Sequence, residues 1–187
     1  MRWITVCGGG NGAHALVGTL LLRDETTHIR LYLPFKEERS CFAEAISAQS
    51  LFKVQLAGDV HSAASNRIHV TADPKEAVLS PIIIMVVPAF AHGAILSQLA
   101  PYLTEESAIA ALPARSGLEY QARDIPGAAG WNGCVIIGFQ TLPWACRIKE
   151  FGHSVVIHGT KKRVGAACLP KKEIKEKAEV LSTLLGM

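Results

Sequence analysis

The sequence has no marked excess of charge of one sign and no apolar run long enough to cross a membrane. Its 187 residues include 19 Lys and Arg against 16 Asp and Glu, which gives a formal net charge of +3. Because no basic run is longer than Lys161-Lys162-Arg163, we do not expect nucleic acid as a partner. The longest apolar run, Ile82 to Val87, is far shorter than the roughly 20 residues of a membrane span, and the N-terminus lacks a signal-peptide pattern. The sequence predicts a soluble, cytoplasmic protein without membrane contact.

Cysteine is scarce, and its spacing suits neither a metal site nor a disulfide framework. The five cysteines are odd in number and never spaced C-x-x-C. They are Cys7, Cys41, Cys134, Cys146 and Cys168. This pattern predicts reduced thiols and no bound metal. Because 49% of the residues are apolar, the chain can bury a large core, which excludes intrinsic disorder, and its length is that of one domain.

The sequence does contain a regular alternation of apolar strands and helices. The strong strand candidates are Trp3–Cys7, Ile29–Leu33, Ile82–Val87, Ser107–Leu112 and Cys134–Phe139, with weaker ones at Ser154–Ile157 and Val164–Cys168 and one or two short strands within 51–70. Helices are expected over 13–23, 36–49, 89–103, 118–123 and 171–185, and a short one begins at Asp73-Pro74. Strands that are apolar throughout are typical of a parallel sheet between helices. The sequence predicts an α/β fold, a Rossmann-like doubly wound, mostly parallel sheet with helices on both faces.

A glycine-rich turn directly follows the first strand. Gly8-Gly9-Gly10-Asn11-Gly12-Ala13 fits the dinucleotide fingerprint G-x-G-x-x-A and opens an amphipathic helix. In this pattern the first glycine makes the sharp turn, Gly10 lets a pyrophosphate approach the backbone, and Ala13 allows close packing of helix on strand. The N–H groups and positive dipole end of the helix favour phosphate. The pattern indicates a dinucleotide cofactor; the alternative is a turn with only a structural role.

The residues after the second strand leave the choice between NAD and NADP open. An acidic side chain normally stands there to hold the ribose hydroxyls. This chain has Leu33-Pro34-Phe35 instead, and the nearest carboxylate is Glu37. Lys36 and Arg39 are cations suited to a 2′-phosphate. All three charges are also consistent with a solvated helix face.

Three further side chains stand near the expected carboxyl edge of the sheet, where open α/β sheets bind ligands. His92 follows the strand at 82–87, His14 lies beside the glycine turn, and Arg115 follows Leu112-Pro113. Each histidine either contacts a ligand or packs in the core. Arg115 either binds an anion or lies in an exposed loop.

Three segments together resemble the opine dehydrogenases. They are Val6–His14, Val87–His92 and the unusual block Thr141–Gly152, in the order and at the spacing of that family. Enzymes of this family use NADH to condense a 2-oxo acid, usually pyruvate, with an amino acid, and a helical substrate domain follows their nucleotide domain. The resemblance covers their N-terminal half. It implies that residues 1–187 form a dinucleotide-binding domain for NAD(H), whose closing helix at 171–187 leads toward an absent substrate domain.

The resemblance also implies the places of the site residues. The cofactor-binding set comprises Gly8, Gly9, Gly10, Asn11, Gly12 and Ala13 at the pyrophosphate and Pro88, Ala89 and Phe90 at the nicotinamide end, and the substrate-cleft set comprises Arg115, Gln140, Thr141 and Cys146. The family's catalytic residues belong to the second domain, so we expect the isolated chain to be incomplete for turnover. The expected partners are small molecules, a 2-oxo acid and an amino acid.

Two departures from the family concern the amine substrate. Octopine-forming members have a glutamate where this chain has Gln140 and a glutamine where it has Arg115. A carboxylate forms paired hydrogen bonds with a guanidinium that a neutral amide does not, so we expect glycine, alanine or taurine rather than arginine. Two other functions compete: a catalytically inactive NAD(H)-binding module, and a two-domain reductase of glycerol phosphate or ketopantoate, which does not explain the block 141–152.

Overall fold

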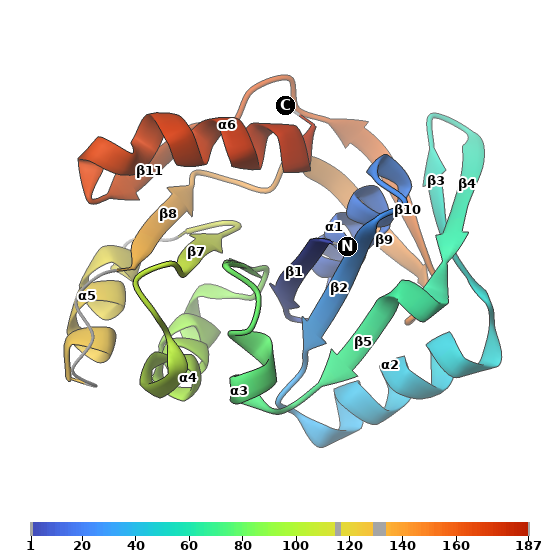
Figure 1. Cartoon of the computed structure of the whole chain (residues 1–187). Helices are drawn as coiled ribbons and strands as arrows, with labels where there is room; N and C mark the ends of the chain where they lie inside the picture. Colours follow the sequence, from blue (N-terminus) through green and yellow to red (C-terminus); the bar gives the residue numbers. More distant parts are fainter. Residues whose placement is uncertain (1, 115–116, 129–133, 187) are drawn as a thin grey trace.

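A seven-stranded sheet runs through the centre of the molecule in the order β11-β8-β7-β6-β1-β2-β5 (Figure 1). The computed structural model describes residues 2–114, 117–128 and 134–186. The strands of this sheet are β1 Arg2–Cys7, β2 Thr27–Tyr32, β5 Ile68–Thr71, β6 Ile82–Met85, β7 Ala108–Ala111, β8 Val135–Phe139 and β11 Ala166–Leu169. Neighbouring strands are parallel except β11 and β8, which are antiparallel. The mostly parallel sheet predicted from the sequence is confirmed.

The strand order reverses beside β1. The chain passes from β1 to β2 and β5 on one side, and then returns to β6, β7 and β8 on the other. Open α/β sheets bind their ligands at such a switch point, beyond the carboxyl ends of the strands. In this chain that place adjoins Cys7 and Met85, the paired last residues of β1 and β6.

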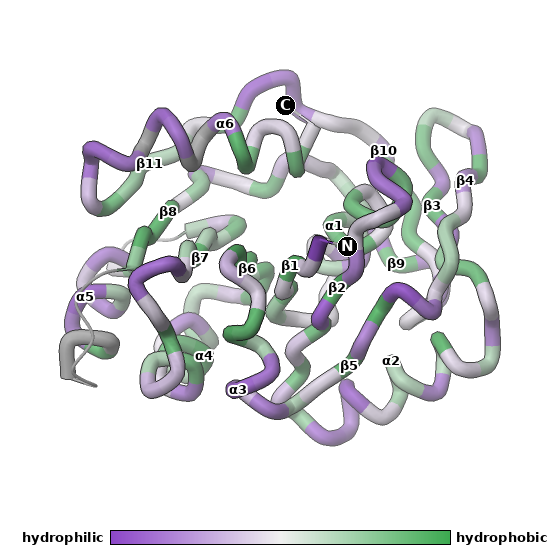
Figure 2. Tube along the Cα trace, viewed as in Figure 1, coloured by the Kyte–Doolittle hydropathy of each residue, from purple (hydrophilic) through white to green (hydrophobic). Residues whose placement is uncertain are grey.

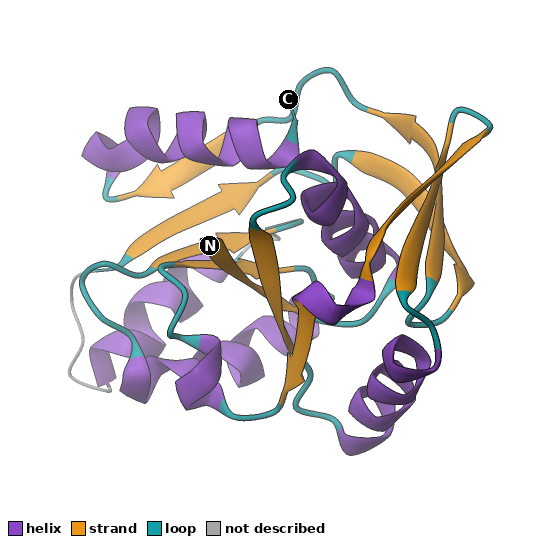
Figure 3. Cartoon of the chain, turned by 45° about the vertical axis from the view of Figure 1, so that its right-hand side comes forward, coloured by secondary structure: helices purple, strands orange, loops and turns teal. Residues whose placement is uncertain are grey.

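Helices cover both faces of the sheet, as predicted (Figures 1 and 3). Their bounds are α1 Asn11–Arg23, α2 Lys36–Ala48, α3 Pro74–Ala77, α4 Ala89–Leu99, α5 Leu118–Ala128 and α6 Ile174–Leu185, with short 3-10 turns η1 Ser65–Arg67, η2 Ala100–Tyr102 and η3 Lys171–Glu173. The helices α1 and α6 share one face, and α3, α4 and α5 share the other. Asp73 caps α3 by accepting a hydrogen bond of 2.9 Å from the Lys75 amide. None of the described helices combines the length and apolar character that spanning a membrane requires.

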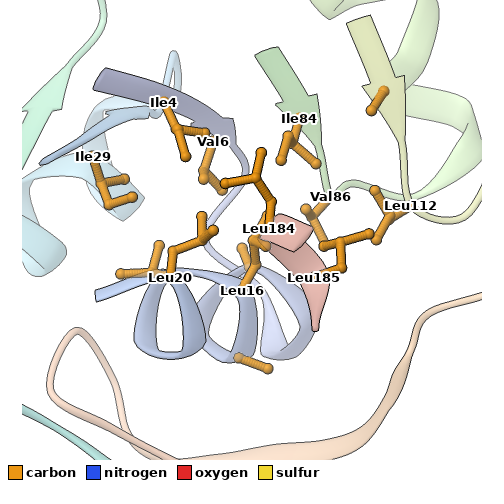
Figure 4. Close-up of a cluster of buried hydrophobic side chains, with 14 of the residues drawn as sticks. Ile4, Val6, Leu16, Leu20, Ile29, Ile84, Val86, Leu112, Leu184 and Leu185 are labelled. Atoms are coloured by element: carbon orange, nitrogen blue, oxygen red, sulfur yellow. The ribbon is translucent and has the colours of Figure 1, made fainter. Parts of the chain in front are cut away.

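Alternate side chains of the central strands enter two separate cores. On one face, Ile4 of β1 meets Leu16 of α1 and Leu184 of α6 (Figure 4). On the other face, Cys7 and Met85 belong to the core beneath α4 and α5. Figure 2 shows the resulting hydrophobic stretches along β6 and β8. Burial on both faces is the reason why these strands read as continuous apolar runs.

A second sheet of four strands packs against α1 in the order β4-β3-β10-β9, and this corrects the single sheet expected from the sequence. Its strands are β3 Leu51–Leu56, β4 Asp59–Ala64, β9 Trp144–Glu150 and β10 Ser154–Thr160. Segment 51–70 therefore contributes to three strands rather than one or two. Two of them, β3 and β4, belong to this second sheet, and the third, β5, belongs to the main sheet. The strand β9 was not expected. Its inward residues Trp144, Cys146 and Ile148 alternate with exposed ones, which is the pattern of a half-buried strand.

The helix α1 consequently lies between two sheets (Figure 3). All residues from Gly12 to Gly18 are buried, so the helix is buried on more than the one face that its amphipathic pattern predicts. A Cβ on Gly18 would lie 2.4 Å from Cγ2 of Val54 in β3. Gly18 thereby allows the second sheet to approach the helix that follows the glycine turn.

Candidate functional site

The glycine turn joins β1 to α1 at the switch point. Gly8 has a φ of +111°, and a Cβ there would lie 2.6 Å from the carbonyl oxygen of Val86, so glycine is required. At Gly10 the surroundings are the opposite, because an added Cβ would meet no atom within 4 Å. Gly10 is the N-cap residue of α1, and no side-chain hydrogen bond caps this helix. Open space and first-turn amides without a cap together form the geometry of an anion site.

The turn is packed between the end of β6 and the block 141–152. A Cβ on Gly8 would lie 2.7 Å from Cγ1 of Val87, and one on Gly12 would lie 3.0 Å from Cδ2 of Leu142. Ala13, next in the chain, is buried. Three sequence segments that are far apart along the chain therefore meet at one place in the fold.

Glu38 is the residue that sequence reasoning missed. Its carboxylate accepts a hydrogen bond from the Gly9 amide, and its Oε1 atom would lie 2.6 Å from a Cβ on Gly9. Partial burial raises the pKa of this carboxyl group. The fingerprint predicts a carboxylate at the strand end, and the nearest one in sequence is Glu37, which is exposed. The available signal was its position in the first turn of α2, since side chains there point back toward the N-terminal end of the helix.

The two cations near Glu38 differ in their roles. The Nη1 atom of Arg39 donates to the carbonyl oxygens of Leu33 at 3.1 Å and Pro34 at 3.2 Å. Arg39 thus fixes the loop between β2 and α2. Lys36 is exposed at the start of α2.

Asn11 and His14 connect the turn to the second sheet. Asn11 Oδ1 accepts a hydrogen bond of 2.8 Å from the Ile148 amide, and its carbonyl oxygen accepts one of 3.4 Å from Cys146 Sγ. His14 is buried, and its Nε2 accepts a hydrogen bond of 2.8 Å from the Gly152 amide. Burial raises the pKa of the half-buried Cys146 thiol. The sequence left open whether His14 contacts a ligand or packs in the core, and in the structure it packs in the core.

The segment after β6 has three exposed residues at the start of α4, followed by a buried histidine. Pro88, Ala89 and Phe90 are exposed where α4 begins, and Phe90 has 89% of its surface accessible. His92 is 1% exposed, and its Nε2 atom has no hydrogen-bond partner. Burial lowers the pKa of His92. This histidine packs in the interior and does not line the exposed edge.

The substrate-cleft candidates divide between two places. Gln140 is exposed and lines a largely apolar cavity of about 620 Å³, together with Gly138 and Gly165. Thr141 follows it and accepts a hydrogen bond from Lys161, whereas Cys146 lies beside Asn11. Arg115 lies outside the described residues. Among the described residues, no cluster of His, Cys, Asp or Glu side chains is arranged to hold a metal ion.

Comparison with known proteins found no matching family model but clear relatives. Octopine dehydrogenase of Mizuhopecten yessoensis is 38% identical over 184 residues, which cover 97% of this chain and 45% of the relative. Tauropine dehydrogenase of Arabella iricolor is 32% identical over 166 residues, 84% of this chain and 40% of the relative. The chain matches the N-terminal half of the opine dehydrogenases. It spans about half the length of the curated relatives it matches.

Solved structures agree with this match. Octopine dehydrogenase in complex with NADH and L-arginine superimposes with a TM-score of 0.87 at 34% identity, over 98% of this chain and 46% of that one. A ketopantoate reductase from Ralstonia eutropha has a TM-score of 0.70 at 12% identity, and this similarity shows the shared fold alone. The Rossmann-type fold predicted from the sequence is therefore confirmed.

Proposed function

We propose that this chain is the nucleotide-binding half of an NADH-dependent opine dehydrogenase, which condenses a 2-oxo acid such as pyruvate with an amino acid. The supporting observation is the open space above Gly10 beside the first-turn amides of α1. This anion site lies at the switch point of a chain that is 38% identical to octopine dehydrogenase. In the proposal, residues 1–187 form the dinucleotide-binding domain, and 171–187 lead toward a helical substrate domain that holds the catalytic residues.

The residues of the turn fit the dinucleotide. The cofactor-binding set proposed is Gly8, Gly9, Gly10, Asn11, Gly12 and Ala13 for the pyrophosphate, and Pro88, Ala89 and Phe90 for the nicotinamide end. To these we add Glu38 for the ribose hydroxyls, because its carboxylate already lies at the Gly9 amide. When bound, the nicotinamide supplies a hydride to the imine formed from keto acid and amine. This chain's own contribution is to bind and orient the cofactor and to form one wall of the cleft.

Glu38 and Arg39 favour NADH over NADPH. The Glu38 carboxylate repels a 2′-phosphate at the ribose. Arg39, one of the two cations suited to that phosphate, uses its Nη1 atom on the carbonyl oxygens of Leu33 and Pro34. NADH is the preferred cofactor in this proposal because the charged group nearest to the glycine turn, the Glu38 carboxylate, is negative.

The amine substrate proposed is small or acidic, such as glycine, alanine or taurine. Gln140 stands where octopine-forming relatives have a glutamate, and a neutral amide does not replace the paired bonds of a carboxylate with a guanidinium. Gln140, Thr141, Cys146 and Arg115 form the proposed cleft set. We also place the protein in the cytoplasm, which its five cysteines support because all of them lie outside disulfide bonds.

The decisive experiment is a titration of NADH followed by nicotinamide fluorescence. Gly10→Val fills the space above the turn and is expected to weaken NADH binding at least about tenfold, or ~1.4 kcal/mol. Gly159→Val is the matched control, because a Cβ at Gly159 in β10 also meets nothing within 4 Å. Wild-type protein that does not bind NADH, or Gly10→Val with unchanged affinity, contradicts the proposal.

A turnover assay tests the assignment of catalysis to the other half. Loss of general acid or base assistance costs roughly 10²–10⁴-fold in rate. The isolated chain is therefore expected to oxidise no NADH with pyruvate and glycine, alanine, taurine or arginine. Robust turnover with any pair shows that residues within the chain suffice, and overturns the proposed division of the site.

A further inference from the structure

The second sheet has a small cavity of its own beside the turn that joins β9 to β10. This second-sheet cavity has a volume of about 190 Å³. Six of its eight lining residues are polar: Lys53, Gln55, Lys149, Glu150, His153 and Ser154. None of the eight belongs to the glycine turn or to the segment that follows β8. The cavity is therefore separate from the candidate cofactor and substrate residues described above.

Backbone pairing brings the lining residues together from three strands. The carbonyl oxygen of His153 accepts a hydrogen bond of 2.9 Å from the Lys53 amide, and the His153 amide donates one of 3.1 Å to the carbonyl oxygen of Glu150. Ser154 of β10 is paired with Lys53 of β3 on one side and with Glu150 of β9 on the other. The sheet itself therefore sets the relative positions of these residues.

Two buried polar side chains line the second-sheet cavity without a hydrogen bond. His153 is 4% exposed and Ser154 is 7% exposed. Neither the imidazole ring nor the hydroxyl is hydrogen-bonded to another described residue. The Nε2 atom of His153 lies 3.8 Å from Oε2 of Glu150, which is too far for a hydrogen bond. Because the large majority of buried polar side chains have a hydrogen-bond partner, these two indicate a ligand that supplies one.

The cavity also has an excess of positive charge. Among the described residues, none of the ion pairs includes Lys53 or Lys149. The carboxylate of Glu150 already accepts a hydrogen bond of 3.5 Å at Oε1 from Nε2 of Gln49, outside the cavity lining. Two ammonium groups and the side-chain amide of Gln55 therefore offer N–H donors to a ligand. Such a donor set suits the oxygen atoms of an anion.

We propose that the second-sheet cavity is a binding site for a phosphate group, distinct from the cofactor turn. Its volume is below the roughly 300–1,000 Å³ of pockets for drug-sized ligands, so the ligand is small. A phosphate group carries about −1.5 to −2 charges at pH 7, which two lysines balance. The Ser154 hydroxyl and a ring N–H of His153 donate to its oxygen atoms from the buried side. The group comes from inorganic phosphate or from a small phosphate monoester.

The test follows the NMR shifts of the Lys53, His153 and Ser154 amides in the full chain, at pH 7.5 and at an ionic strength held constant with potassium chloride. The probes are inorganic phosphate and methyl phosphate. We expect saturable shifts at these amides with phosphate and none when chloride alone is varied. Saturation by inorganic phosphate alone identifies the free ion as the ligand, and saturation by methyl phosphate with equal or higher affinity identifies a monoester.

Variants separate a built site from general attraction to a basic surface. Lys53→Met and Lys149→Met keep the aliphatic stem, and each is expected to weaken phosphate binding about fivefold, or ~1 kcal/mol. Ser154→Ala removes the buried hydroxyl and should weaken binding in the same direction. Lys162→Met is the matched control, because this exposed lysine lies outside the cavity lining; it should leave binding unchanged. Circular dichroism checks that each variant is folded.

Three results overturn the site. The first is the absence of a saturable shift at the Lys53, His153 and Ser154 amides with either probe. The second is a set of shifts confined to the amides of Asn11 and Gly12, which would place phosphate at the glycine turn alone. The third is equal affinity for phosphate in wild type, Lys53→Met and Lys149→Met. None of these readings depends on NADH, so the site and the proposed function are tested independently.

Discussion

The Nε2 atom of His14 accepts a hydrogen bond from the amide of Gly152, a residue 138 positions further along the chain. This bond fixes the tautomer of the ring, because Nε2 must carry a lone pair while Nδ1, 3.1 Å from the Gly10 carbonyl oxygen, donates. The ring is enclosed by Phe42 and Phe151, each with its centroid 5.1 Å away. His14 therefore joins the N-cap residue of α1 to the turn after β9.

Removing the His14 ring should destabilise the fold. His14→Leu leaves the Gly152 amide buried without an acceptor, and an unsatisfied buried donor costs about 1–3 kcal/mol. Urea unfolding should show this loss in the free energy of unfolding. The control is His61→Ala, on the exposed edge strand β4, which should change stability by no more than about 0.5 kcal/mol. Equal stability of His14→Leu and wild type would show that the bond is unimportant.

His14 should also make the folded protein less stable in acid. Burial lowers the pKa of His14 from 6.5 to about 4. Below pH 6.5 the unfolded chain therefore binds a proton that the folded chain excludes, so stability falls as the pH falls from 6.5 toward 4. The full shift corresponds to about 3 kcal/mol. His14→Gln keeps an acceptor but does not titrate, so its stability should depend less on pH across this window than that of wild type. Parallel pH dependences would exclude His14 as the cause.

The main sheet was predictable because its signals are local. A few consecutive apolar residues are enough to predict the buried strands Trp3–Cys7 and Ile82–Val87. The spacing of the glycines is enough to predict the turn. The second sheet was not predictable in the same way. Its β3 pairs with β10 about 100 residues away, and the buried face of α1 that it covers contains His14 and Gly18, which do not read as core residues in sequence.

The site was predictable in part for the same reason. Sequence spacing selected Gly8 and Gly10, and the structure gives them distinct surroundings that the fingerprint alone does not distinguish. Glu38 was missed because it reaches the glycine turn through the orientation of its helix. It does so from the first turn of α2. Such placements depend on long-range packing, which no local pattern records.

The two glycines should respond differently to the same substitution. Gly8→Ala places a Cβ 2.6 Å from a backbone oxygen at a positive φ, so we expect a loss of at least about 2 kcal/mol in the free energy of unfolding. Gly10→Ala meets no atom within 4 Å and should alter stability by less than about 0.5 kcal/mol, while weakening NADH binding. Thermal or urea unfolding of both variants, with NADH titration of Gly10→Ala, checks the pair. Equal destabilisation by the two changes would contradict this description of the turn.

Glu38 should control the choice of cofactor. Its carboxylate accepts a bond from the Gly9 amide, so Glu38→Gln keeps an acceptor there but removes the charge that opposes a 2′-phosphate. We expect the ratio of NADPH to NADH dissociation constants to fall about tenfold, or ~1.4 kcal/mol, at constant ionic strength because charge effects are screened by salt. Glu37→Gln, the exposed neighbour, is the control and should leave the ratio unchanged. Because burial raises the pKa of Glu38, the preference of wild type for NADH should weaken as the pH falls, and it should begin to do so at a higher pH than for an ordinary glutamate. A ratio that is the same in Glu38→Gln and wild type at neutral pH would mean that another residue selects the cofactor.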